Sequence, residues 1–490
     1  MDTTTNRRRS DRRIPWHVRL GLVLASEWAR LAALVAFAML VAFTGGSSRS
    51  DVPALIVLRP AAVLFLAYAL LVASAGQLRE VRAPMLILGS LMLLALLQLV
   101  PLPAVIWTGL PHRDVVAEIS ALLGMGEIAR PLSLDPNRTW NTLFALFVPL
   151  ATIGLMAIQG AKQRRWIFPL LVAVGAVSAA IGLMQVLAGG GLYFYRITHV
   201  GYPVGLFANK NHQAVMLLWL MMAACLFGGA GGSRRRSEAL TVGGALAAIL
   251  VLFPLLILTG SRAGLLLSVP TLALCAWMLF RGPSFQALLR RAGAKARLLK
   301  GLLAAILIGP LVFVFGALAT SGRRTALSRL FELDVADDVR SSYFSILVEM
   351  ALDYLPFGSG FGSFEEAFNA FEPSALLSSR YLNHAHNDLV ELVIEGGVPG
   401  LVILLGALAW LGRSFVRAWR AGGTDGRIPA VFYVSSICLW LAASLVDYPL
   451  RTPLGAMLVA GLTVQLSFLS TGTYSGSAVP DKRDRQGRAY

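Results

Sequence analysis

Twelve apolar runs, each long enough to cross a lipid bilayer, recur along the 490-residue chain. A membrane-spanning helix needs about 20 such residues. Only 14% of the residues are charged, against roughly 25% in a typical soluble domain. These patterns predict an all-α, polytopic membrane protein with about twelve transmembrane helices. The runs lie at about 27–46, 55–75, 84–106, 141–160, 167–187, 213–231, 240–259, 264–281, 300–319, 389–412, 431–449 and 453–470.

The basic residues predict the orientation of the chain. Twelve spans put both termini on one side, and most of the 43 Lys and Arg fall in segments on that side. Because basic loops stay in the cytoplasm, both termini are expected there. The net charge of +17 is then mainly a topology signal and no sign of nucleic-acid binding. The first run follows basic residues but lacks a cleavage site, so it is interpreted as an anchor and not as a removed signal peptide.

The cysteines carry no recognisable chemistry. Cys225, Cys275 and Cys438 all fall within apolar runs, and no CxxC pair occurs. We expect them to pack as small apolar residues, with no disulfide framework and no zinc site.

Three segments on the opposite, periplasmic side are long enough to fold, at about 107–140, 188–212 and 320–388. The last is the largest, and its many apolar and aromatic residues argue against disorder. Residues 343–355 have helical spacing, and Pro356-Phe-Gly358 ends that helix. A glycine-rich turn at 358–362 follows. We predict a large, partly helical periplasmic loop.

Polar residues gather where the sixth apolar run begins. Asn209, Lys210, Asn211 and His212 stand together there, and such groups bind carbohydrate hydroxyls or phosphate oxygens. They also suit the start of a helix, and for His212 alone this structural interpretation is equally good.

A single arginine occupies the tight turn between the seventh and eighth runs. The turn is Thr259-Gly260-Ser261-Arg262-Ala263-Gly264, so Arg262 is expected near the outer membrane surface. Its side chain could simply extend to the interface. The location suits the binding of an anion better, because the positive-inside bias does not account for a cation on this side.

The segment that opens the tenth run combines two histidines, an amide and three carboxylates. Ionisable groups at the mouth of a membrane helix indicate a functional site. Asp388 followed by Glu391 resembles a capping box, so the helix is predicted to begin at Asn387 or Asp388. His386 would then lie at the positive end of the helix dipole, where a neutral imidazole and an anion are both favoured.

Three glycines and a proline follow further into the same run. Gly396, Gly397 and Gly400 are expected to allow close packing, and Pro399 to favour a kink.

Four motifs follow one another along the chain. They are Phe207-x-Asn209-x-Asn211, Gly260-Ser261-Arg262-Ala263-Gly264, Arg340 before an aromatic helix ending in Pro356-x-Gly358-x-Gly360, and His386-Asn387…Glu395-Gly396-x-x-Pro399-Gly400. Together they resemble the O-antigen ligase and polymerase superfamily, whose members are bacterial inner-membrane glycosyltransferases with a fold of the GT-C kind. The resemblance covers about residues 200–410, and the tract Asp447-Tyr448-Pro449-Leu450-Arg451 is also similar to the superfamily. That tract could add a carboxylate and a guanidinium at the cavity mouth.

The resemblance implies transfer of a glycan from an undecaprenyl-diphosphate carrier to a hydroxyl acceptor, outside the cytoplasm. The acceptor would be a glycan or lipid A-core, the reaction inverting, and neither metal nor cofactor would be needed. His386 would be the base or the group that orients the acceptor hydroxyl, and Arg262 and Arg340 would contact the diphosphate. His384 and Asn387 would position the acceptor, with Asn209, Lys210 and Asn211 as further substrate-binding residues. The alternatives to Arg340 for the diphosphate are Arg323, Arg324 and Arg329.

The sequence suggests five segments. They are a basic cytoplasmic segment (1–26), N-terminal transmembrane helices (27–200), a ligase-like core (201–412) that includes the periplasmic loop 320–388, C-terminal transmembrane helices (413–470) and a cytoplasmic tail (471–490).

Two other functions fit twelve spans. A transporter or flippase for lipid-linked or small polar substrates predicts ionisable groups near the bilayer midplane and matched broken helices in two halves. Here the polar groups crowd the outer face, which favours transfer chemistry. A scaffold of a polysaccharide export machine would leave His386 dispensable. The sequence does not distinguish a ligase from a polymerase.

Overall fold

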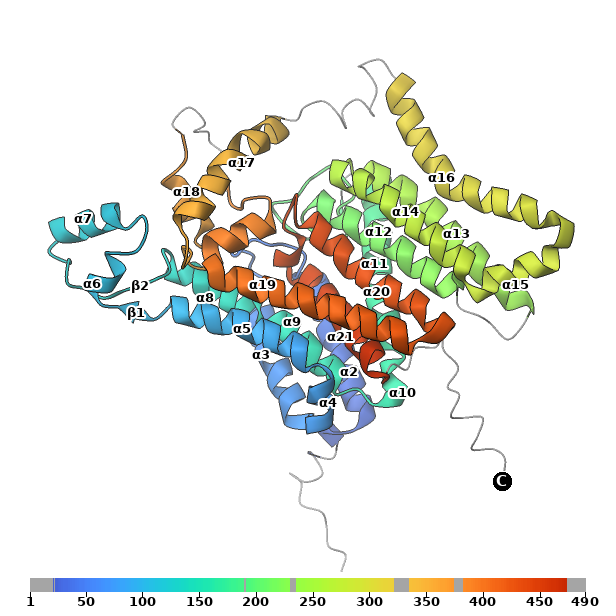
Figure 1. Cartoon of the computed structure of the whole chain (residues 1–490), viewed down its shortest axis with the longest axis horizontal. Coiled ribbons are helices and arrows are strands. Elements are labelled where there is room, and N and C mark those ends of the chain that lie inside the picture. Colours follow the sequence, from blue (N-terminus) through green and yellow to red (C-terminus); the bar gives the residue numbers. More distant parts are fainter. Residues whose placement is uncertain are drawn as a thin grey trace, which may run out of the picture.

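The structure is a computed structural model that describes residue 21 and residues 23–188, 191–229, 235–320, 335–373 and 382–473. Each of the twelve predicted apolar runs coincides with a helix, as Figure 1 shows. The elements are α2 (Glu27–Thr44), α3 (Leu55–Val72), α4 (Ala75–Glu80), α5 (Arg82–Gln98), β1 (Pro101–Leu102), α6 (Ala104–Trp107), α7 (Asp114–Leu122), β2 (Arg130–Pro131), α8 (Pro136–Ala145), α9 (Phe147–Ala157), α10 (Ala161–Arg164), α11 (Ile167–Leu187), α12 (Lys210–Gly229), α13 (Arg235–Leu258), α14 (Arg262–Arg281), α15 (Pro283–Ala292), η1 (Gly293–Lys295), α16 (Ala296–Thr320), α17 (Val335–Asp353), α18 (Phe364–Asn369), α19 (Asp388–Ala421), α20 (Gly423–Ala443), η4 (Pro449–Arg451) and α21 (Pro453–Thr471).

The all-α polytopic fold is confirmed. Within the described residues, nine helical segments are long and apolar enough to cross a membrane, with α8–α9 and α10–α11 each counted as one. The apolar helices α5 and α20 are shorter, and α16 occupies the ninth predicted run.

Two predicted span boundaries are wrong. The third run was expected to continue to residue 106, but α5 ends at Gln98 because prolines at 101 and 103 follow. Residues 101–107 instead form β1, which pairs antiparallel with β2, and α6. The eleventh run was expected to continue to residue 449, but α20 ends at Ala443. Residues 444–452, which follow the end of α20, contribute to the candidate site.

The central helix of the bundle is α12, which is buried on almost every face. It packs against α11, α13, α14 and α20. Its Trp219, together with Phe168, Phe432 and Tyr433, belongs to the main apolar core. Because this helix is fixed on all sides, the polar residues at its N-terminal end are held rigidly.

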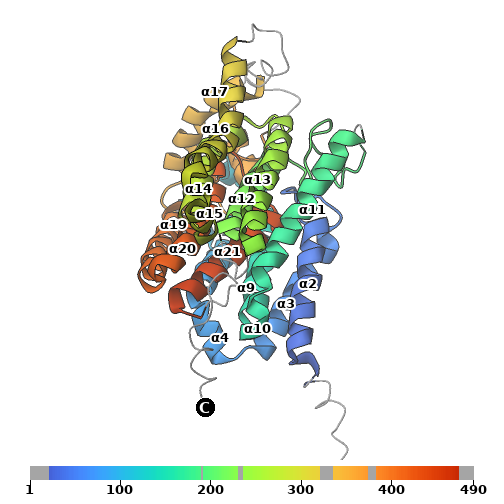
Figure 2. The ribbon, with the colours of Figure 1, turned by 90° about the vertical axis from the view of Figure 1, so that its right-hand side faces the viewer.

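The connections between helices gather at two opposite ends of the bundle. In Figure 2, α17 lies at the top, whereas the short connecting helices α4 and α10 lie at the bottom. The alternation of spans places residues 46–54, 191–209, 259–261, 382–387 and 444–452 at the same end as α17. We call this the loop end.

The largest loop has its own apolar core within the residues described. Tyr343, Leu347 and Met350 of α17 pack with Phe364 and Phe368 of α18. The predicted helix at 343–355 is therefore confirmed, as part of the longer α17.

The glycines of α19 and of the loop after α17 make one interlocked backbone unit. Gly397 has a φ of 57° and interrupts α19 with a kink. The amide of Ser359 donates to the carbonyl of Ile394 at 2.8 Å, and that of Gly360 donates to the carbonyl of Glu395 at 3.0 Å. A Cβ on Gly358 would lie 2.4 Å from the Glu395 carbonyl oxygen. The predicted kink is thus confirmed. The predicted close packing is also present, and it is made between the glycines of α19 and the loop that follows α17.

Candidate active site

Asp447 is the centre of a buried polar cluster at the loop end. Its side chain is buried, and one oxygen accepts hydrogen bonds from the amides of Asn209 (3.1 Å) and Asn211 (2.7 Å). The other oxygen lies 3.7 Å from His212 Nε2 and 3.6 Å from His386 Nδ1. This single carboxylate therefore joins residues of two predicted motifs that are far apart in the sequence.

The electrostatics keep Asp447 ionised. Burial alone raises the pKa of a carboxyl group. The neighbouring imidazoles of His212 and His386 oppose this effect, and the net result is a pKa well below the usual range for aspartate. An ionised Asp447 lies 3.6 Å from His386 Nδ1 and would favour a proton on that nitrogen.

The ring of Tyr448 lies close to three histidine side chains. Its ring centroid lies 4.5 Å from that of His384, 5.0 Å from that of His386 and 5.6 Å from that of His212. His386 also has a φ of 50°, a left-handed conformation that is uncommon for residues other than glycine. Such local strain is concentrated at functional sites.

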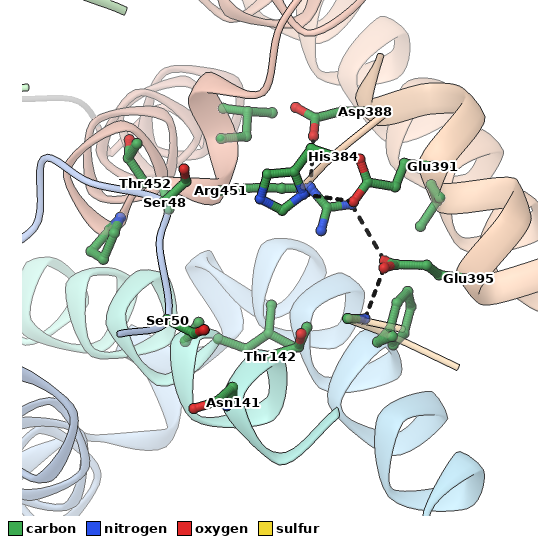
Figure 3. A pocket seen from close by; sticks show the side chains of 18 of the residues that line it. Ser48, Ser50, Asn141, Thr142, His384, Asp388, Glu391, Glu395, Arg451 and Thr452 are labelled. Atoms are coloured by element: carbon green, nitrogen blue, oxygen red, sulfur yellow. Dashed lines mark hydrogen bonds and ion pairs between the residues drawn. The ribbon is translucent and has the colours of Figure 1, made fainter. Parts of the chain in front are cut away.

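A second cluster surrounds Arg451, which η4 presents towards α19. Its guanidinium lies 3.0 Å from Asp388, 3.1 Å from Glu391 and 3.4 Å from Glu395. The three carboxylates, spaced along one face of the helix, outweigh the effect of burial and raise the pKa of Arg451 above its usual value. Figure 3 shows this network.

Two of these carboxylates also hold the backbone around the site. Glu391 accepts from the amide of Ala385 at 2.8 Å and pairs with His384 Nδ1 at 2.8 Å. Glu395 accepts from the amides of Gly362 (2.9 Å) and Phe364 (3.3 Å). Because both are buried and well hydrogen-bonded, they connect α19 to the loops on either side of it.

The start of α19 agrees with the prediction, but its cap differs. The helix begins at Asp388, with Asn387 as N-cap, and the Asn387 Oδ1 accepts from the amides of Leu389 and Val390 at 3.1 Å each. The expected capping box is wrong, because Glu391 turns towards His384, Ala385 and Arg451.

Two cavities adjoin these clusters. The larger, about 670 Å³, has a polar end with His384, Asp388, Glu391 and Arg451 and an apolar part lined by leucines of α3, α19 and α20. We call it the amphiphilic cavity. The leucines that line it include Leu55, Leu58, Leu404, Leu408, Leu441 and Leu445, together with Leu91 of α5 and Leu146 between α8 and α9.

The smaller cavity, about 520 Å³, is lined mainly by polar and aromatic groups, and we call it the polar cavity. Its lining includes Thr198, His199, Asn209, His212 and Tyr448. Burial, followed by the charge of Lys210, lowers the pKa of His199. The two cavities share Ser47, Ser48, Arg49 and Asn383 as a common wall.

The structure brings several of the predicted site residues together. His384, His386, Asn209 and Asn211 come together around Tyr448 and Asp447, and Asn387 caps the adjacent helix. The Lys210 ammonium lies 4.1 Å from the ring centroid of Tyr202.

Of the predicted arginines, only the side chain of Arg262 is described. Arg262 begins α14, whose Ser261 cap accepts from the Gly264 amide, and it lines neither cavity. Arg340 lies in α17, and its side chain is outside the described residues. The alternatives Arg323, Arg324 and Arg329 also lie outside them.

Of the tract at 447–451, Arg451 lines the amphiphilic cavity as expected, whereas Asp447 lines neither cavity and is buried beside His386. Sequence reasoning missed Arg59 and Arg138, which line the amphiphilic cavity from α3 and α8. A charged residue inside an apolar run was the available signal for Arg59.

The fold and the site thus define a helical membrane protein whose buried polar centre opens into both an amphiphilic and a polar cavity. Residues 246–405 match the O-antigen ligase family. This match supports the O-antigen ligase and polymerase superfamily, so the resemblance seen in the motifs is confirmed, and it indicates a ligase- or polymerase-type glycosyltransferase of a bacterial membrane. The matched segment includes Arg262, Arg340 and His386, whereas Asn209 and Asp447 lie outside it. No curated protein matches the chain significantly.

Proposed function

We propose that this protein transfers a glycan from undecaprenyl diphosphate to a hydroxyl acceptor at the periplasmic face of the inner membrane. The observation that carries the proposal is the pair of adjoining cavities. An amphiphilic cavity suits a donor with a polar head and an isoprenoid chain, whereas a polar cavity with amide, imidazole and phenol groups suits sugar hydroxyls. Their shared wall brings donor and acceptor together.

The proposed base is His386. Asp447 faces its Nδ1, so Nε2 takes the proton from the acceptor hydroxyl. The acceptor oxygen forms a bond to the anomeric carbon while the bond from that carbon to the phosphate oxygen breaks, and the diphosphate leaves with the electron pair. A single displacement of this kind inverts the anomeric configuration. Arg262 and Arg340 are proposed to stabilise the leaving diphosphate.

His384, Asn209, Lys210 and Asn211 are proposed to bind the substrates. His384 lines the amphiphilic cavity and Asn209 the polar one. Since the Asn387 oxygen is used by the helix cap, only its amide nitrogen remains for the acceptor.

The test is transfer in vitro from a purified undecaprenyl-diphosphate glycan, without nucleotide and with a metal chelator present. His386→Ala is expected to lower the rate roughly 10²- to 10⁴-fold, the usual contribution of a general base, with donor binding unchanged. His112→Ala, at a histidine that contacts Asp353 away from both cavities, is the matched control and should retain activity.

Full activity of His386→Ala would exclude His386 as the base, and loss of all activity with the chelator would contradict a metal-independent reaction. The product distinguishes the two subclasses: a ladder of repeats indicates a polymerase, and a single transferred block indicates a ligase.

A further inference from the structure

Four arginines line the amphiphilic cavity, and three of them are neutralised by carboxylates. Arg49 pairs with Asp51 at 2.8 Å. Arg451 has its three partners on α19. Arg138 pairs with Asp135 (3.3 Å), Glu365 (2.5 Å) and Glu366 (3.4 Å).

Arg59 differs from these three. Its Nη1 donates to the Asn141 Oδ1 at 2.5 Å, and its Nε is buried without a hydrogen-bond partner. Within the described part of the chain, no carboxylate pairs with it. A guanidinium has five N–H donors, and an unpaired charge inside a membrane helix is costly. Arg59 is the fifth residue of α3, and its bond to Asn141 directs the side chain towards α8, a neighbouring helix that also lines the cavity.

The surroundings of Arg59 suit an anion. The neutral donors Ser50, Asn141 and Thr142 also line the amphiphilic cavity, and Figure 3 shows them on the side away from Glu391 and Glu395. A phosphate close to the carboxylates of α19 would be repelled. On the α3–α8 side the two lining carboxylates, Asp51 and Glu365, are each paired with an arginine, Arg49 and Arg138, so their charge is compensated.

The apolar part of the cavity begins beside Arg59. Leu55 and Leu58 of the same helix line it, as do Leu146 and Pro149 of the neighbouring chain segment. A ligand with a phosphate at Arg59 could therefore place a hydrocarbon chain against these residues.

We propose that Arg59, positioned by Asn141, binds a phosphate group of the lipid-diphosphate donor in the amphiphilic cavity. This inference rests on the proposed function and adds α3 and α8 to the donor site, next to the part of the chain that matches the ligase family. A guanidinium pairs with phosphate in a bidentate manner that an amide cannot reproduce.

The experiment measures binding of a short-chain polyprenyl diphosphate to the purified full-length protein in detergent. Removal of one charge-assisted contact should weaken binding roughly 10- to 100-fold in Arg59→Gln, and Arg59→Lys should restore part of it. Arg30→Gln is the matched control. Arg30 is also an arginine on a membrane helix with a buried, unpartnered Nε, but it donates to the Ile158 carbonyl and does not line the cavity.

A second variant separates anion binding from a structural role. Asn141→Asp gives Arg59 the carboxylate partner that it lacks, so the folded variant should be at least as stable as the wild-type protein. The new carboxylate competes with phosphate, however, and diphosphate binding should fall at least tenfold. If Asn141→Asp and Arg59→Gln both bind as tightly as wild type, Arg59 is not a phosphate ligand.

Phosphatidylglycerol and inorganic phosphate serve as competing probes. The proposal requires that Arg59→Gln weakens binding of the diphosphate much more than binding of phosphatidylglycerol. An equal loss of affinity for both would identify a general lipid site and overturn the proposal. If wild type itself neither transfers glycan nor binds the diphosphate, the proposed function fails. If wild type binds the diphosphate and the variants bind it equally tightly, only the role of Arg59 is rejected and the proposed function stands.

Discussion

At the scale of single residues, Asp447 holds the site together through its negative charge. Because its folded-state pKa lies well below the usual value, the ionised form contributes stability at every pH above the unfolded pKa of about 4. That contribution is lost as pH falls through the lower, folded-state pKa.

Asp447→Asn is therefore expected to lower the free energy of unfolding by about 1–3 kcal/mol at pH 7. The difference in melting temperature from wild type should stay constant between about pH 8 and 5 and narrow only below about pH 4. Thermal unfolding in detergent, followed by intrinsic fluorescence, measures this. A difference that narrowed already between pH 8 and 6 would show that the pKa of Asp447 is not lowered.

Glu391 offers a second test at this scale, because it pairs with His384 and Arg451 and accepts from the Ala385 amide. Glu391→Gln keeps the shape but removes the charge, leaving part of the Arg451 charge uncompensated. We expect a loss of about 3–5 kcal/mol in stability, as for a broken buried ion pair. Replacement of the exposed Glu118 by Gln should leave the melting temperature unchanged.

At the scale of elements, the kink of α19 is set by Gly397 and by its contact with the loop after α17. A Cβ at Gly397 would lie 2.3 Å from the carbonyl oxygen of Pro356, and its φ of 57° is one that other residues rarely adopt. The beginning of the helix, which carries the three carboxylates, therefore depends on this glycine for its direction.

Gly397→Ala is expected to lose about 1–3 kcal/mol from backbone strain alone, with more from the clash, and to lower transfer activity. Gly406→Ala, on the same helix with open space at its Cβ, should gain up to about 1 kcal/mol from better helix propensity. The melting temperatures of the two variants measure the cost of backbone strain at Gly397 against the gain in helix propensity at Gly406. Equal effects at the two positions would show that the kink is not required.

Much at this scale could be predicted from the sequence. Continuous apolar runs marked the helices of the bundle, and Asn387 at the start of α19 was recognisable from the residues around it. Helices α7, α15 and α18 were not predicted. The ends of α5 and α20 were misjudged, because hydropathy continues through Pro101 and Val446 although the helices stop. Apolar composition indicates burial or lipid contact but does not by itself show where hydrogen bonding along the helix stops.

At the scale of the whole molecule, the two ends of the bundle are expected to face different compartments. Because the basic segments lie at the end with α4 and α10, we predict that this end is cytoplasmic. In a variant without the three native cysteines, Glu118→Cys in α7 should react with a membrane-impermeant maleimide in spheroplasts. Arg79→Cys in α4, also exposed, should react only after the membrane is permeabilised. The reverse labelling pattern would invert the topology and remove the periplasmic site.

The sequence by itself determined the membrane class, the positions of the apolar helices and the end of the bundle at which the polar motifs gather, because hydropathy and charge bias act locally along a chain. Only the tertiary structure decided which polar groups meet. Asn209 donates a hydrogen bond to Asp447, which lies 238 residues further along the chain. Arg451 pairs with three carboxylates of α19. Arg59 has no carboxylate partner among the described residues. Such pairings depend on how packed helices bring distant segments within a few ångströms, and this distance information is not contained in the pattern of any single segment.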